Sequence, residues 1–308
     1  MNILVTGGAG YVGTTLIPLL LAQRHRVRVL DNLMFNGASL LPFFRSRNFE
    51  FIKGDIREQS AVREVVKEQD AVVHLAAIVG YPACRQNPKL AEEVNIGGTK
   101  SLVEALGDDQ LVILASTGSS YGYIREEVTE ATPLNPLSLY GQTKDEAEKI
   151  VRAHPRSIIF RFMTAFGVSP RMRLDLMIND FSYKAVTEQY LVVYEKHYKR
   201  GFIHVHDMAR AILFALDHAD AMRGETYNVG ARSLGLSKED ICEAIKRCAN
   251  VYVHYAEIGK DEDQRNYDVN FDKIESLGFS TTVGLDEGIQ ELIAAYQAIK
   301  YVKPYSNA

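Results

Sequence analysis

The sequence contains few cysteines, and their spacing fits neither a disulfide framework nor a zinc site. The three cysteines are Cys84, Cys242 and Cys248, which are too few and too scattered for either. We therefore expect a reducing cytoplasm as the location of the chain, and no bound metal.

Excess positive charge and long hydrophobic runs are also absent. The formal net charge is −4 at pH 7, so electrostatics give no reason to expect nucleic-acid binding. The longest leucine-rich run, residues 16–22, is far shorter than the ~20 apolar residues of a membrane span. Residues 2–6 have the pattern of a strand, so no signal peptide is expected. We therefore expect that the protein binds neither nucleic acid nor a membrane.

The overall composition is that of an ordinary globular protein. Hydrophobic residues make up 46% and charged residues 24% of the 308 residues, which is typical of a soluble enzyme. A chain of this length can bury a large core and form one large or two modest domains.

The first half of the chain alternates short apolar runs with amphipathic segments. The runs predict strands at residues 2–6, 27–30, 49–52, 71–75, 110–115 and 158–161, and the amphipathic segments predict helices at 11–23, 61–68, 90–106 and 142–153. Strands separated by helices indicate a parallel sheet with helices on both faces. Right-handed crossovers then give the α/β class and a doubly wound Rossmann sheet.

This alternation ends at about Met163. Strand-like pieces at 190–194 and 251–255 then mix with helices at 207–216, 238–248 and 285–299. We predict a Rossmann domain over residues 1–163 and mainly a smaller α/β substrate lobe over residues 164–308, with some segments returning to the Rossmann domain. No long linker separates the two parts, so we expect the active site between them.

A glycine-rich loop lies between the first predicted strand and the first predicted helix. In Thr6-Gly7-Gly8-Ala9-Gly10-Tyr11-Val12-Gly13, Gly7 allows a tight turn, Gly10 lets the backbone approach a pyrophosphate, and Gly13 lets the helix pack on the strand. The helix N-terminus supplies free N–H donors and a positive dipole end. A strand, a glycine loop and a helix in this order predict a dinucleotide site in the first domain.

Acidic residues at strand ends indicate which dinucleotide binds. Asp31 ends the second strand, where it can accept both adenosine ribose hydroxyls and repel a 2′-phosphate, so NAD is favoured over NADP. The alternative is a simple turn carboxylate. Arg26 and Arg28 alternate on that strand and are interpreted as solvated residues. Asp55 follows the third strand and either meets the adenine amino group or caps a helix.

Two segments carry candidate catalytic groups. In Tyr140-Gly141-Gln142-Thr143-Lys144 the tyrosine and lysine share one face if the segment is helical. A nearby ammonium favours the ionised phenol, which makes Tyr140 usable as a proton shuttle, and Lys144 can also bond the nicotinamide ribose. Thr117, at the carboxyl end of the fifth strand, can bond the substrate oxygen. Each segment taken alone also fits a surface helix pair or a turn of small residues.

Taken in order, these motifs resemble the extended short-chain dehydrogenase/reductase family along essentially the whole chain. The glycine loop, the strand-end acid, the strand His74-Leu75-Ala76-Ala77, the Ser-Thr turn and Tyr-x-x-x-Lys follow one another as in its NAD-dependent nucleotide-sugar epimerases and dehydratases. The resemblance implies Thr117, Tyr140 and Lys144 as catalytic residues, Asn95 as a structural or relay residue, and a homodimer built on residues 90–106 and 142–153 of each subunit. The implied cofactor-binding residues are Gly7, Gly10, Tyr11, Val12, Gly13, Asp31, Asn32, Asp55, Ile56, Leu75, Ala76, Ala77, Asn95, Tyr140 and Lys144.

The second lobe also resembles the nucleotide-sugar site of that family. Arg200 and Arg265 match arginines that meet the substrate diphosphate, which suits bidentate guanidinium binding, and Asn179 matches an asparagine offered to the same group. The alternative for each arginine is a surface charge. The pair His204 and His206 shares a strand face but lacks a third ligand, so it is a poor metal site.

Residues 161–175 narrow the resemblance to a branch that includes GDP-heptose 4-dehydrogenases. Thr164 stands where most relatives have asparagine, and Arg171 and Arg173 become candidates for sugar or phosphate contacts, with surface charges as the alternative. The implied substrate-binding residues are Thr117, Thr164, Arg171, Arg173, Asn179, Arg200 and Arg265.

The resemblance implies oxidation of a nucleotide-diphosphate sugar, usually at C4, as the first chemical step. Dehydratases of the family place Asp-Glu directly after the catalytic threonine, whereas this chain has Gly118 and Ser119, which cannot act as acid or base near neutral pH. We therefore expect a 4-epimerase or a 4-dehydrogenase, with a GDP-sugar or GDP-heptose among the substrates considered. A 4-keto-sugar reductase is the alternative, and a 4,6-dehydratase or an idle NAD-binding protein is less favoured.

Overall fold

A seven-stranded parallel sheet is the centre of the computed structural model, which describes residues 1–124, 126–257 and 268–298. Its strands are β1 (Asn2–Thr6), β2 (Arg26–Asp31), β3 (Phe49–Lys53), β4 (Ala71–His74), β5 (Leu111–Thr117), β6 (Ser157–Phe162) and β10 (Glu225–Val229). They lie in the order β10-β6-β5-β4-β1-β2-β3. The order reverses between β1 and β4, so a crevice opens at their carboxyl ends. The predicted α/β doubly wound fold is confirmed.

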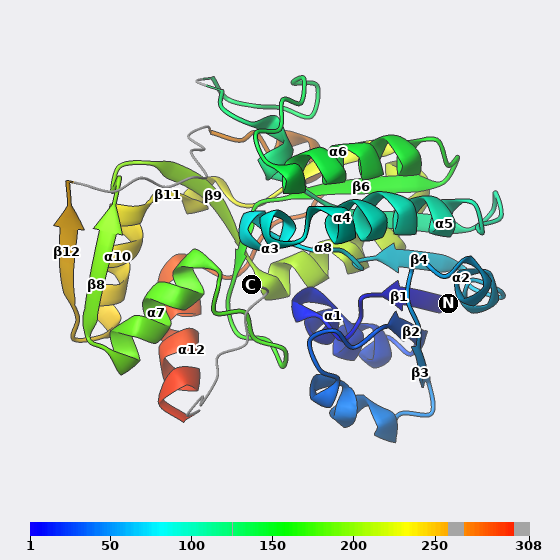
Figure 1. The fold of residues 1–308 in the computed structure, drawn as a ribbon, viewed down its shortest axis with the longest axis horizontal. Coiled ribbons are helices and arrows are strands. Elements are labelled where there is room, and N and C mark those ends of the chain that lie inside the picture. The colour runs from blue at the N-terminus through cyan, green and yellow to red at the C-terminus, as the bar shows by residue number, and fades with distance from the viewer. Residues whose placement is uncertain (125, 258–267, 299–308) are drawn as a thin grey trace.

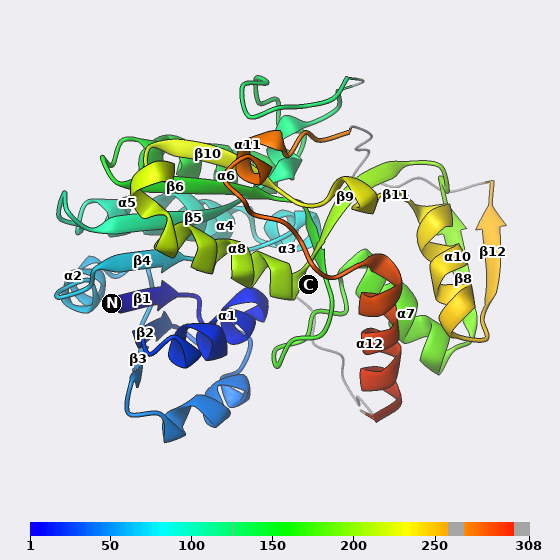
Figure 2. The ribbon, with the colours of Figure 1, turned by 180° about the vertical axis from the view of Figure 1, so that it is seen from behind.

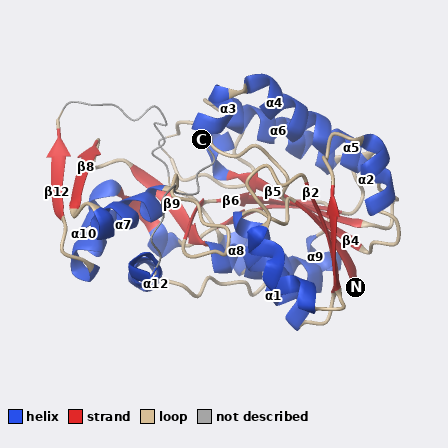
Figure 3. Ribbon diagram, turned by 60° about the horizontal axis from the view of Figure 1, so that its bottom comes forward, coloured by secondary structure: helices blue, strands red, loops and turns tan. Residues whose placement is uncertain are grey.

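Helices cover both faces of the sheet (Figure 3). On one face lie α1 (Tyr11–Ala22) and α8 (Val205–Asp217), and on the other α5 (Thr99–Val103) and α6 (Leu139–Arg152). Because both faces are covered, β1, β4 and β5 are buried almost continuously rather than alternately. This is why their sequences are unbroken runs of aliphatic residues.

The helix predicted for residues 90–106 is present, but it is continuous only over residues 88–103 and is not α-helical throughout. The chain forms α4 (Pro88–Glu92), a π-helical turn (Glu93–Gly98) and then α5. A Cβ at Gly98 would lie 2.5 Å from Cγ2 of Ile56, so this turn comes very close to the loop after β3. A π turn inserts one extra residue per turn, and here it contains Asn95, which points into the interior.

Helix α6 begins three residues before its predicted start. Ser138 is its N-cap, and the Ser138 hydroxyl accepts a hydrogen bond from the Gly141 amide at 3.1 Å. The earlier start places Tyr140 inside the helix, on the first turn. Tyr140 and Lys144 are therefore one helical turn apart, as the predicted spacing requires.

The second lobe contains two small sheets and three helices (Figures 1 and 2). One sheet has the order β11-β9-β7 and the other pairs β12 with β8. The elements are β7 (Thr164–Phe166), β8 (Tyr190–Tyr194), β9 (Lys199–His204), β11 (Gly235–Ser237), β12 (Tyr252–Ala256), α7 (Met177–Thr187), α10 (Lys238–Cys248) and α12 (Leu285–Ala298). Phe166 and Phe202 belong to the core that these helices cover.

Short elements complete the described part of the chain. They are α2 (Gln59–Val65), α3 (Tyr81–Gln86), α9 (Ala219–Met222), α11 (Asp272–Glu275) and the 3-10 turns Ala38–Arg45, Gly118–Tyr121 and Arg232–Leu234. Among the described helices, none is long and apolar enough to cross a membrane.

Candidate active site

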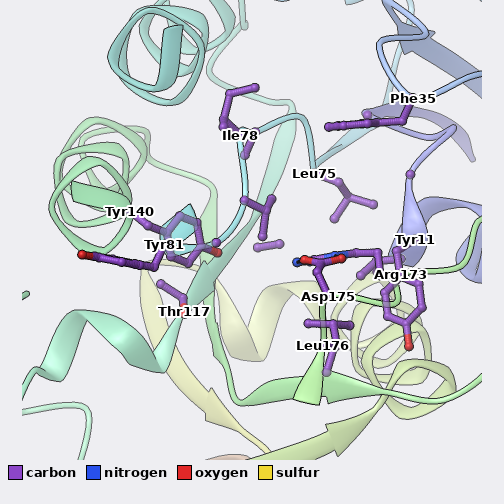
Figure 4. Close-up of a pocket in the computed structure, with 18 of the residues that line it drawn as sticks. Tyr11, Phe35, Leu75, Ile78, Tyr81, Thr117, Tyr140, Arg173, Asp175 and Leu176 are labelled. Atoms are coloured by element: carbon purple, nitrogen blue, oxygen red, sulfur yellow. Dashed lines mark hydrogen bonds and ion pairs between the residues drawn. The ribbon is translucent and has the colours of Figure 1, made fainter. Parts of the chain in front are cut away.

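A cavity of about 1060 Å³ extends from the glycine loop along the carboxyl ends of the central strands to the second lobe. Most of the predicted site residues line it: Gly7, Gly10, Tyr11, Val12, Gly13, Asp31, Asn32, Asp55, Ile56, Leu75, Ala76, Ala77, Thr117, Tyr140, Lys144, Thr164, Arg171, Arg173 and Arg200. Predicted residues from both halves of the sequence thus face one cavity (Figure 4).

The glycine loop has the shape that a dinucleotide requires. Gly7 has φ +71°, and a Cβ there would lie 2.7 Å from the backbone nitrogen of Ala76, so no side chain fits. A Cβ at Gly13 would lie 2.6 Å from the carbonyl oxygen of Gly8, which explains the close packing of α1 on the loop. The N-cap residue Gly10 gives the helix no side-chain cap. The bare helix N-terminus therefore fits a pyrophosphate.

Asp31 is held as a fixed acceptor at the end of β2. Its carboxylate accepts the amides of Ala9 at 3.0 Å and Leu33 at 2.8 Å. Burial raises the pKa of Asp31, while these two amides and the charge of Arg171 oppose the increase. After these two hydrogen bonds, the carboxylate can still accept further hydrogen bonds from ribose hydroxyls.

Asp55 lies farther along the same wall of the cavity. Its carboxylate is paired with Arg57 at 2.9 Å and accepts a hydrogen bond from the Asn32 amide at 3.1 Å. The Arg57 guanidinium lowers the pKa of Asp55 to about 2. The N-cap of α2 is Glu58, so the alternative in which Asp55 caps this helix is wrong.

The three predicted catalytic residues all line the cavity. Thr117 ends β5, and its hydroxyl donates to the Ser119 hydroxyl at 3.0 Å. Lys144 is only 4% exposed, and burial lowers the pKa of its ammonium to about 8, against the opposing charge of Glu148. In Figure 4 Tyr140 lies beside Thr117 and Tyr81. A phenol, a hydroxyl and an ammonium therefore share one wall.

Asn95 does not line the cavity but supports it. Its amide oxygen accepts a hydrogen bond from the Ile78 amide at 2.7 Å, and its amide nitrogen donates to the Ile78 carbonyl and the Thr143 hydroxyl, each at 3.0 Å. The buried side chain thus ties the loop after β4 to α6. These contacts give Asn95 a structural position, behind the wall that Tyr140 and Lys144 form.

Asn179 is not at the predicted place. It is fully buried; its oxygen accepts a hydrogen bond from the Gly167 amide at 3.0 Å, and its nitrogen donates to the Arg173 carbonyl at 2.9 Å. The side chain is occupied in holding the turn at Gly167, where φ is +108°, and it is not among the residues that line the cavity. Arg265, the other predicted diphosphate contact, lies outside the described residues.

The second-lobe end of the cavity is rich in charge. Arg173 forms an ion pair with Asp175, its Nε donating at 3.2 Å, and Arg200 approaches from β9. Sequence reasoning missed Tyr81 and Lys238, which also line this cavity. The Lys238 ammonium donates to the Tyr194 carbonyl at 3.0 Å. Neither residue belongs to a motif, so only their position in the fold indicates a role.

The NAD dependent epimerase/dehydratase family model matches residues 3–230. The chain belongs to this family. It is 29% identical to the low-salt glycan biosynthesis protein Agl12 of Haloferax volcanii, covering 96% of this chain and 98% of that protein. It is 30% identical to a dTDP-glucose 4,6-dehydratase of Streptomyces niveus, covering 96% and 93%.

Solved structures agree with this family membership. The UDP-glucose 4-epimerase of Brucella ovis, solved with NAD, superposes with a TM-score of 0.83 at 29% identity, covering 96% of this chain and 98% of that chain. NAD is the cofactor of the family and of this chain, as the glycine loop and Asp31 predict. This member of the NAD-dependent epimerase/dehydratase family is accordingly an enzyme.

Proposed function

We propose that this enzyme oxidises C4 of a nucleotide-diphosphate sugar and returns the hydrogen to the opposite face, and is thus a 4-epimerase. The observation that carries the proposal is the single cavity in which Thr117, Tyr140 and Lys144 lie at one end of the cofactor groove and Arg200 and Arg173 lie on the second lobe. Relatives that act on dTDP-, UDP- and CDP-sugars support this class of substrate.

The protein residues divide the chemistry in a simple way. Bound NAD supplies the group that accepts hydrogen from C4. Tyr140 takes the proton of the C4 hydroxyl and gives it back when the ketone is reduced. Thr117 bonds the same oxygen, and the buried ammonium of Lys144 stabilises the ionised phenol. The oxygen becomes a ketone and then a hydroxyl again, so no proton or electron is lost over one turnover.

Dehydration is disfavoured because neither of the two residues that follow Thr117 carries a carboxyl group. Gly118 and Ser119 follow it, and Ser119 is engaged with Thr117 through its amide at 3.1 Å. Among the described residues that line the cavity, the carboxylates are Asp31, Asp55, Asp175 and Asp180. Those of the second lobe are paired with Arg173 and Lys184. Loss of a C6 hydroxyl needs an acid and a base that this wall does not offer.

Two further assignments belong to this proposal. Residues 90–106 and 142–153 are the proposed homodimer contact, and α5 and α6, which belong to these two segments, lie side by side on one outer face of the sheet. Residues 1–163 would hold NAD, and residues 164–308 would mainly hold the sugar nucleotide.

A GDP-sugar or GDP-heptose is one candidate substrate, on the resemblance of residues 161–175 alone. A 4-dehydrogenase and a 4-keto-sugar reductase remain the alternative reactions.

The identity of the product tests the reaction. The enzyme is incubated with GDP-, UDP- and dTDP-sugars, and the product mass and its C4 stereochemistry are recorded. We expect an unchanged mass with an inverted C4 and, in heavy water, no deuterium in the product, because the hydrogen at C4 never exchanges with solvent. Loss of two hydrogens would indicate a 4-dehydrogenase instead, and loss of one water would refute the argument from Gly118 and Ser119.

A further inference from the structure

The loop between β7 and α7 is fixed to the start of the cofactor-binding helix α1. The Tyr11 phenol donates to the Gly167 carbonyl at 2.6 Å, and the Ser169 hydroxyl donates to the Tyr11 carbonyl at 2.7 Å. The Ser169 hydroxyl also lies 3.0 Å from the Thr14 hydroxyl. A loop of the second lobe is thereby held against the helix whose N-terminus fits the pyrophosphate.

Arg171 extends from this loop toward the adenosine side of the groove. Its guanidinium carbon lies 4.6 Å from the ring centroid of Phe35, which follows β2 in the loop after Asp31. The residue is only 4% exposed, and one guanidinium nitrogen donates to the Met172 carbonyl at 3.1 Å. Both Arg171 and Phe35 line the cavity.

This position distinguishes Arg171 from Arg200, another guanidinium that is predicted to bind the substrate. The charge of Arg171 acts on Asp31 and opposes the rise that burial causes in its pKa. Arg200 instead lies on β9, in the small sheet of the second lobe, where it is registered with Leu236 of β11. Arg171 thus lies beside the segment that follows β2, whereas Arg200 lies on a strand of the second lobe, although the sequence resemblance assigns both to the substrate.

A guanidinium in this setting suits a phosphate ligand. An arginine that rests on an aromatic ring keeps its planar donors in one orientation, so less freedom is lost when an anion binds. Asp31 contributes one negative charge near Arg171. The pyrophosphate of NAD would bring further negative charge to the adjacent helix N-terminus. Arg171 adds a cation from the second lobe to this part of the cavity.

We propose that Arg171 binds the cofactor rather than the sugar nucleotide, its guanidinium contacting the pyrophosphate of NAD from the side opposite the glycine loop. The loop at residues 167–173, fixed by Tyr11 and Ser169, then forms a strap across the dinucleotide groove. The inference rests on the NAD cofactor of the family. It depends on the proposed substrate only for the comparison with Arg200.

Ligand binding by the full chain tests the assignment without measuring turnover. Retained NAD is quantified after dialysis and denaturation, and the dialysed protein is titrated by calorimetry with ADP-ribose, then with UDP and GDP. In Arg171→Ala we expect the Kd for ADP-ribose to rise about tenfold, the usual effect of losing a charge-assisted hydrogen bond. The affinity for whichever of UDP and GDP binds should stay unchanged.

Arg200→Ala is the matched control, because it removes the same kind of side chain from the same cavity, but from β9 of the second lobe. We expect the reverse pattern, with weaker nucleoside diphosphate binding and unchanged ADP-ribose binding. Phe35→Leu should weaken ADP-ribose binding less than Arg171→Ala does.

The pattern of the two titrations decides the outcome. If Arg171→Ala leaves ADP-ribose binding intact, or weakens both ligands alike, the assignment to NAD is wrong. If Arg200→Ala spares nucleoside diphosphate binding while Arg171→Ala behaves as expected, the proposed substrate is wrong and the assignment of Arg171 stands.

Discussion

Tyr140→Phe is expected to reduce turnover by a factor of about 10²–10⁴, the usual contribution of a positioned general acid or base. The substitution keeps the ring that lines the cavity from α6 and removes only the hydroxyl that we propose takes the C4 proton. The loss should appear in kcat, and the Kd for NAD should change little. Single-turnover kinetics with the active sugar nucleotide measure the effect directly.

Tyr81→Phe is the matched control for that experiment. Tyr81 presents a second phenol to the same cavity and lies near Tyr140 and Thr117 in Figure 4, but it comes from α3, and the cation one turn away is Arg85, which donates to its hydroxyl at 3.3 Å. We expect it to change KM more than kcat. If Tyr140→Phe turns over like the native enzyme, Tyr140 is not the proton shuttle.

The sequence was sufficient to predict the strands at the centre of the sheet. Strands such as β4 and β5 are buried on both faces, so their aliphatic runs are visible without any partner. By contrast, β10 was missed because Thr226 and Asn228 interrupt its apolar residues. The buried Asn228 is satisfied by the Tyr121 hydroxyl, 2.6 Å away and from a distant part of the chain. A strand whose polar groups find remote partners has no local signature.

The predicted site residues fall into two groups for a similar reason. Gly7 and Asp31 have roles set by backbone shape and strand ends, which neighbouring residues determine, and both line the cavity. The position of Asn179 depends on the turn at Gly167 and on Arg173, so a resemblance in sequence could not reveal that its amide is already occupied. The contact of Arg171 with Phe35 likewise joins residues far apart in the sequence, so no local pattern could reveal it.

A buried ion pair behind the catalytic wall was also invisible in the sequence. Arg161 on β6 and Glu148 on α6 are 3% and 1% exposed, and their closest atoms are 2.8 Å apart. The Ser116 hydroxyl donates to Glu148, and Arg161 donates to the Tyr121 hydroxyl at 3.0 Å. The ion pair therefore joins α6, the helix that carries Tyr140, to β6, and the hydrogen bond from Ser116 adds β5, the strand that ends in Thr117.

Arg161→Met is expected to cost about 3–5 kcal/mol in the free energy of unfolding, because it leaves the Glu148 carboxylate buried without its cation. Glu148→Leu should cost a similar amount, because it leaves the Arg161 guanidinium buried without its anion. Replacing both residues together should cost less than either single substitution, since no buried charge remains without a partner. Urea unfolding of the three variants measures these differences as shifts in the midpoint at constant slope.

The comparison of the single and double variants separates charge from packing. If the double variant loses as much as the two single variants combined, then the cost comes from the cavity and the lost hydrogen bonds, and the pair is not held by electrostatic compensation.

Glu148 also has a functional consequence, because its charge opposes the fall in the pKa of Lys144. Any variant that lacks this carboxylate should therefore deprotonate Lys144 at a pH below about 8, and the upper limb of its pH–rate profile should move to lower pH, whereas a purely structural role of Glu148 leaves that limb in place.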